Sequence, residues 1–84
     1  MIERKVLLKT LDDVKKFVDV MAEKTYDVEL LSGKYVVNAK SVMGVLSLDL
    51  THPLTMVANV EVDEELLDEI IPYEEAALQL AKKG

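Results

Sequence analysis

The chain has 84 residues, half of them hydrophobic, so a single folded domain over residues 1–84 is expected; it has no cysteine, which excludes disulfides, thiolate metal sites and cysteine catalysis. Its formal net charge of −6 argues against nucleic acid and anionic membrane surfaces as partners, because both attract clustered lysine and arginine. No apolar run approaches the roughly 18 residues of a membrane helix and no secretory signal is expected, which together with the lack of cysteine fits a cytoplasmic protein.

The first quarter of the chain has the pattern of a strand followed by a helix. Residues 2–8 are expected to form a strand that buries Ile2, Val6 and Leu8. Thr10 is expected to cap a helix, because an acid three residues later completes a pattern similar to a capping box. This helix has apolar residues at helical spacing for its buried stripe, namely Val14, Phe17, Val18 and Met21.

A hairpin and a short helix are expected next. Residues 26–31 alternate between apolar and polar side chains, and residues 34–39 form a second strand after a turn at residues 32–33. Ser41 then begins a helix over residues 41–48 that contains no charged side chain. A surface helix normally keeps a charged face, so this helix is either buried or an exposed apolar contact site.

The second half of the chain predicts one more strand and a helical end. The strand, over residues 54–62, is expected to turn alternate apolar residues to one face, namely Met56, Ala58, Val60 and Val62. The helical remainder has an apolar stripe of Leu66, Ile70, Ala77 and Leu80. Pro72 interrupts it, so either a kink or a fresh helix is expected there, since proline in a first turn costs little.

The element order is therefore β-α-β-β-α-β-α, which predicts an α+β domain. Four amphipathic strands need one face covered, and three helices can cover it. The expected fold is therefore a four-stranded sheet covered on one face by three helices; the resemblance described below implies that the sheet is antiparallel and the fold an open-faced β-sandwich. Element order alone is a moderate signal, because ferredoxin-like folds share much of it.

Residues 39–49, with the sequence AKSVMGVLSLD, add a more specific signal. This stretch resembles the serine-helix segment of HPr, the histidine-containing phosphocarrier of the bacterial sugar phosphotransferase system. The resemblance extends over nearly the whole chain in element order and is specific in residues only over about 40–49. It implies an HPr-like fold and protein partners from the phosphotransferase system or from transcriptional regulation.

The resemblance also implies a phosphocarrier site, and the sequence departs from the family there. HPr carries phosphate on a histidine at the start of its first helix, with an arginine nearby. Counted back from Ser41, these two positions fall on Thr10 and Asp12. Threonine cannot form a phosphohistidine, and the aspartate would repel an incoming phosphate. The phosphocarrier site is therefore expected to be degenerate.

Two residues could in principle replace the missing histidine. Thr10 is better explained as a helix cap, since its hydroxyl has no evident base. His52, the only histidine, is either a relocated phosphoacceptor or an ordinary loop residue, and the second interpretation is favoured because the only arginine is Arg4. Neither a metal site nor a cofactor is expected: the acids at residues 63–69 lack the spacing of a calcium loop and suit a helix start instead.

The segment that begins at Ser41 supplies the remaining site residues. Ser41 matches the HPr position that a dedicated kinase phosphorylates in many Gram-positive bacteria, and capping of the helix is the simpler role that is compatible with it. The resemblance implies that Val42, Met43 and Leu46 face outward and contact partners. Gly44 weakens the helix and is expected to permit close approach of the backbone.

The leading interpretation is a non-enzymatic HPr-like module for regulation or protein interaction, controlled through Ser41 and without phosphohistidine transfer. Its nearest analogue is the catabolite-repression HPr-like protein, which lacks the histidine and keeps the serine. Two alternatives remain. One is an active phosphocarrier in sugar uptake that uses His52. The other is a binding module unrelated to sugar transport that self-associates across a two-fold axis through Val42, Met43 and Leu46. The chain is expected to be a monomer or a weak homodimer.

Overall fold

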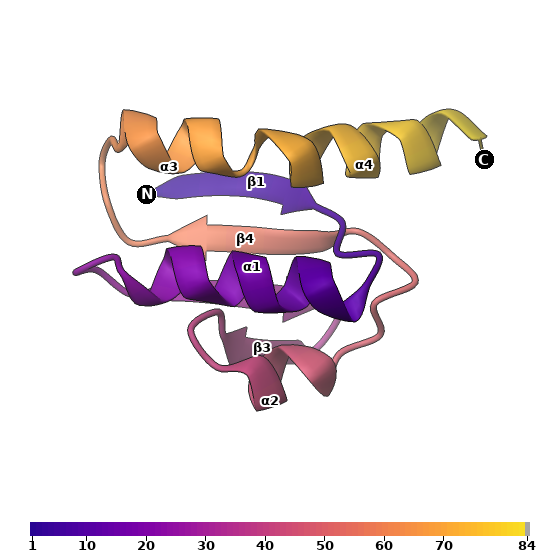
Figure 1. The fold of residues 1–84 in the computed structure, drawn as a ribbon, viewed down its shortest axis with the longest axis horizontal. Helices are drawn as coiled ribbons and strands as arrows, with labels where there is room; N and C mark the ends of the chain where they lie inside the picture. The colour runs from indigo at the N-terminus through magenta and orange to yellow at the C-terminus, as the bar shows by residue number, and fades with distance from the viewer. Residues whose placement is uncertain (84) are drawn as a thin grey trace.

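Four antiparallel strands form one sheet in the order β1-β4-β2-β3 (Figure 1). In this computed structural model, which describes residues 1–83, the strands are β1 Ile2–Val6, β2 Val28–Ser32, β3 Tyr35–Asn38 and β4 Leu54–Ala58. The first and third quarters of the chain meet in the sheet, because β4 pairs with β1 as well as with β2. The four strands predicted from the apolar pattern, and the antiparallel sheet implied by the resemblance to HPr, are therefore confirmed.

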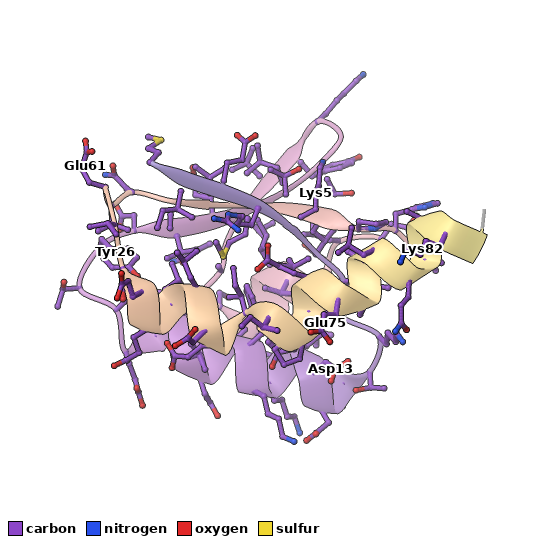
Figure 2. All side chains as sticks on the ribbon, turned by 90° about the horizontal axis from the view of Figure 1, so that it is seen from above. Lys5, Asp13, Tyr26, Glu61, Glu75 and Lys82 are labelled. Atoms are coloured by element: carbon purple, nitrogen blue, oxygen red, sulfur yellow. The ribbon has the colours of Figure 1, made fainter. Side chains whose placement is uncertain are left out.

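Helices cover one face of this sheet and leave the other open (Figure 2). They are α1 Leu11–Ala22, α2 Val42–Leu46, α3 Glu64–Glu69 and α4 Ile71–Lys83. The predicted last helix is two helices, since α3 ends at its C-cap Ile70 and Pro72 lies in the first turn of α4. Of the two expectations for Pro72, the fresh helix is confirmed.

The core lies between the sheet and the helices. The predicted stripe of α1 is buried, as are Val6 and Leu8 at the end of β1 and beyond it. Phe17 packs edge-on against Tyr73 of α4, with ring centroids 5.3 Å apart and an interplanar angle of 88°. This contact joins the first and last long helices above the sheet.

Two expectations about apolar residues were wrong, both near the ends of elements. β4 stops at Ala58, because Ala58 already pairs with the first residues of β1 and β2, and Val62 is 67% exposed. Leu80 is 37% exposed, because α4 runs on past the end of β1 (Figure 1). In both cases the apolar pattern of the sequence continues beyond the strands against which β4 and α4 pack.

The β2–β3 hairpin turns at Gly33 and Lys34, between the paired residues Ser32 and Tyr35. Gly33 has a φ of +57°, and no other described residue, Lys34 included, has a positive φ. A positive φ at the first of two loop residues alone is typical of a type II′ turn, which suits the twist of a hairpin.

Among residues 1–83, no helix has the length and apolar character needed to cross a bilayer.

Candidate functional site

The candidate site consists of α2 and the first turn of α1; α2 packs against α1 on the covered face of the sheet (Figure 1). Ser41 is the N-cap of α2: its Oγ accepts a hydrogen bond from the Gly44 N–H at 3.1 Å, and its carbonyl accepts one from Val45 at 3.0 Å. Capping accounts for a serine at this position without any further role.

The apolar residues of α2 divide between two faces. Val45 is fully buried and Leu48, just after the helix, is nearly so, whereas Met43 is 79% and Leu46 42% exposed. We call Met43 and Leu46 the α2 patch. Val42 departs from the expectation that it faces outward: it is half-buried and packs against the core, because it lies one turn before Val45.

Gly44 does not serve a close backbone approach. A Cβ added there would lie 3.4 Å from the Ser41 Oγ and 3.5 Å from the Cβ of Val37, which is ordinary van der Waals contact or only slightly tighter. The glycine therefore leaves α2 less stable than an alanine would, without making room for a neighbour.

The first turn of α1 holds the two residues of the expected degenerate phosphocarrier site. Thr10 is the N-cap, and its Oγ accepts from the Asp13 N–H at 3.0 Å, while the Asp13 carboxylate accepts from the Lys9 N–H at 3.1 Å. Asp12 is exposed and lies 3.0 Å from Lys16 one turn further on. Two carboxylates therefore occupy the helix start, where a phosphate would need hydrogen-bond donors and positive charge.

His52 belongs to the connector between α2 and β4, and this connector runs at the end of the molecule where α1 starts (Figure 1). Its side chain is 72% exposed, and its Nε2 is 3.5 Å from a carboxylate oxygen of Asp49. Hydrogen bonds from the hydroxyl and N–H of Thr51 lower the pKa of Asp49 below 3.8. Arg4, the only arginine, pairs instead with Glu74 of α4 at 3.3 Å.

The side chain of Lys40, the residue before Ser41, binds the end of α1 and not the Ser41 side chain. Its Nζ donates to the backbone carbonyl of Lys24 at 2.8 Å, just after the end of α1. The interaction satisfies a carbonyl group at a helix C-terminus with a positive charge, which is favourable for the helix dipole. The lysine therefore joins α2 to α1 and does not contact the Ser41 hydroxyl.

Three of the five acids within residues 63–69 lie around Lys24, whose side chain is only 7% exposed. Its Nζ lies 2.6 Å from Glu69, 3.3 Å from Glu65 and 3.8 Å from Asp63. Burial lowers the pKa of the ammonium, but its hydrogen bonds to Glu69 and Glu65 outweigh burial and leave the pKa above 10.5. Within residues 1–83, no group of three or more acidic, histidine or cysteine side chains is placed to hold a metal ion.

Asp63 caps α3 and also accepts a hydrogen bond from Tyr26, which is labelled in Figure 2. Its carboxylate accepts from the Leu66 N–H at 3.1 Å and from the Tyr26 hydroxyl at 2.7 Å. The bond from Tyr26, followed by the one from Leu66, lowers the pKa of Asp63 below 3.8. Burial, together with this hydrogen bond, raises the pKa of Tyr26 from 10.0 to about 12.

Comparison with known proteins gives a likeness in structure and none in sequence. No protein-family model matches the chain, and no curated protein matches it. Among solved structures, HPr-C-His from Thermoanaerobacter tengcongensis superposes with a TM-score of 0.74 at 21% identity, over 92% of this chain and 94% of that one. The fold is HPr-like. At this identity the likeness establishes the fold alone.

The structure gives two lysines, Lys24 and Lys40, contacts that sequence reasoning did not predict. The Lys40 ammonium binds the backbone carbonyl of Lys24, 16 positions away, and the Lys24 ammonium binds Glu69, 45 positions away. The only signal for Lys24 is charge balance, since five acids within residues 63–69 need a cation nearby. No spacing rule identifies which lysine supplies it.

Proposed function

We propose that this chain is a non-enzymatic, HPr-like regulatory module that binds a protein partner through the α2 patch and the first turn of α1. One observation carries the proposal: Met43 is 79% exposed on a five-residue helix whose other side is anchored in the core by Val45. An exposed methionine on a rigid support suits an adaptable protein contact. Leu46, 42% exposed and three residues after Met43 on the same helix, adds a second apolar side chain to this surface.

The proposal includes the loss of phosphohistidine transfer. Thr10 and Asp12 support it, because a threonine and a carboxylate occupy the positions that the likeness to HPr assigns to the histidine and the arginine. The test is incubation of the purified chain with labelled phosphoenolpyruvate and the general phosphotransferase enzyme, with an HPr as positive control. We expect no acid-labile phosphate on the chain. Label that is lost in His52→Ala would instead establish an active phosphocarrier.

Regulation through Ser41 is the second part of the proposal. A phosphate there would meet the N–H groups at the start of α2, which favour negative charge. Treatment with an HPr serine kinase and ATP is expected to add one phosphate to the wild type and to Ser47→Ala, and none to Ser41→Ala. An unmodified wild type, under conditions that modify HPr, would remove the regulatory part and leave the interaction module.

The partner itself is sought by affinity capture from the native cell. Wild type, Met43→Glu and Lys34→Glu are used as baits. Lys34 is the matched control, because it is exposed in the β2–β3 turn and changes to the same residue. A partner retained by Lys34→Glu and lost by Met43→Glu supports binding through the α2 patch. Equal retention by all three baits contradicts it.

A further inference from the structure

The outward face of α4 carries a stripe of four residues that the proposed function does not use. Ile71, Glu75, Leu78 and Lys82 follow one another at spacings of four, three and four, so they share one side of the helix. All four are exposed, Ile71 by 44% and Leu78 by 62%. The opposite side of α4 packs inward through Ala77.

The C-terminal half of α4 has little around it. The helix projects past the end of β1 (Figure 1), and a hollow of about 480 Å³ lies beside it. Leu78 lies on the edge of this hollow, together with apolar side chains of the helix and the neighbouring connector, Ala77, Ala81 and Pro53. A leucine from another molecule could therefore reach apolar surface on Leu78 and beside it.

The charges of the stripe are self-complementary. Glu75 precedes Leu78 by three residues and Lys82 follows it by four, and Figure 2 labels both charged residues on α4. Among residues 1–82, whose side chains the structure describes, neither has an ion-pair partner. Two antiparallel copies of α4 related by a two-fold axis near Leu78 would place each Glu75 opposite the other copy's Lys82. A parallel pair would place like charges together.

From this charge order we infer that a second copy of the chain covers the outward face of α4, as an antiparallel helix pair centred on Leu78. The two-fold relation makes the contact isologous, so the leucines meet at the axis and two Glu75–Lys82 pairs flank them. Leu78 is the one aliphatic residue of the stripe that lies at the axis, since Ile71 is about two turns away along α4, so the dimer is weak and forms at high protein concentration. The contact is separate from the α2 patch, so both surfaces can be occupied together.

Sedimentation equilibrium over a range of concentrations up to about 1 mM, where a weak dimer of millimolar dissociation constant becomes populated, tests the pairing. We expect the mass to rise from 9.4 kDa toward twice that value. Leu78→Ser, Glu75→Lys and Lys82→Glu are each expected to raise the dissociation constant about tenfold or more, because each removes the central contact or sets like charges opposite each other. A wild type that stays monomeric throughout overturns the inference.

The decisive measurement mixes two of these variants. Glu75→Lys has two lysines in the stripe and Lys82→Glu has two glutamates, so each repels itself, while the mixture restores both ion pairs. An equimolar mixture is expected to dimerise at least as strongly as the wild type. Glu61→Lys and Lys34→Glu make the same charge changes away from α4 and should leave the dimer intact. Failure of the mixture to dimerise, or equal loss in the controls, contradicts this arrangement.

One more variant separates this dimer from self-association through the α2 patch. Met43→Glu alters α2 and leaves the α4 stripe unchanged, so its dissociation constant is expected to equal that of the wild type. A dimer that Met43→Glu disrupts and Leu78→Ser does not would assign self-association to α2 and overturn the inference.

Discussion

The Nζ of Lys24 lies 2.6 Å from Oε1 of Glu69, and this ion pair ties the end of α1 to the end of α3. The backbone carbonyl of the same lysine accepts a hydrogen bond from Lys40 at 2.8 Å, on the other side. Lys24 therefore connects three elements: α1, α3 and the loop that leads into α2. Three acids of residues 63–69, namely Asp63, Glu65 and Glu69, lie around it as counter-charges.

Replacement of this lysine tests how much the connection contributes to stability. Lys24→Met would leave Asp63, Glu65 and Glu69 close together without their cation, and loss of one partner from a largely buried ion pair is costly. We expect the free energy of unfolding in urea at neutral pH to fall by roughly 2–3 kcal/mol. Lys34→Met, in the exposed turn, should change it by less than about 0.5 kcal/mol. Equal effects would mean that the contacts around Lys24 contribute little.

Tyr26 makes stability depend on pH in the alkaline range. Its pKa is about 12 in the folded state and about 10 when unfolded, so between these values only the unfolded chain releases the proton. The contribution is fully present below pH 10.0 and is lost as pH rises toward 12. Urea unfolding at several pH values in this window should give a slope that Tyr26→Phe reduces, by up to about 1.4 kcal/mol per pH unit.

The dependence of stability on alkaline pH is not expected to vanish in Tyr26→Phe, because Lys24 also contributes to it. Its pKa is also raised in the folded state, so stability also decreases above its ordinary value of 10.5, and this decrease should persist in Tyr26→Phe. A variant with the same slope as the wild type would contradict the role assigned to the Tyr26 hydroxyl.

The features that the sequence predicted correctly are those that depend on residues close together in the chain. Thr10 and Ser41 were expected at helix starts, and both are N-caps, because a side-chain oxygen before an apolar helix has a local partner three residues later. The buried face of α1 and the α+β order follow in the same way from spacing. The degenerate phosphocarrier site and the role of Ser41 came from the resemblance to HPr and remain predictions.

The features that sequence reasoning missed depend on contacts between distant segments. β4 ends where β1 and β2 begin, so Val62 lies outside the sheet although the alternation continues through it. Val42 is half-buried because its position on α2 relative to the core depends on how the helix packs against α1 and β3. Lys24 finds its carboxylates about forty residues away, a distance over which spacing carries no information.

The two central glycines should respond to alanine in opposite directions. Gly44→Ala places a Cβ in ordinary contact and favours the helix, so we expect the free energy of unfolding to rise by about 0.5–1 kcal/mol. Gly33→Ala meets open space but must adopt a φ of +57°, so we expect a loss of about 1–2 kcal/mol. Thermal or urea unfolding of both variants checks the signs. A stabilised Gly33→Ala would contradict the turn geometry.

Because Ser41 caps α2, the variants used to study its phosphorylation need to be compared for stability. Ser41→Ala removes the acceptor for the Gly44 N–H and should lower the free energy of unfolding by about 1 kcal/mol, as Thr10→Ala should for α1. Ser41→Asp keeps an acceptor at the N-cap and should remain within about 0.5 kcal/mol of the wild type. Urea unfolding compares the three variants. A destabilised Ser41→Asp would mean that its carboxylate does not replace the hydroxyl.

The two faces of α2 give a direct check on which side is available to a partner. Val45→Ala removes two methyl groups from a fully buried position and should cost about 2 kcal/mol. Met43→Ala changes a side chain that is 79% exposed and should alter stability by less than about 0.5 kcal/mol. Unfolding in urea separates the two cases. A large loss in Met43→Ala would show that this side chain supports the fold, and a binding defect of Met43 variants would then carry no information about the α2 patch.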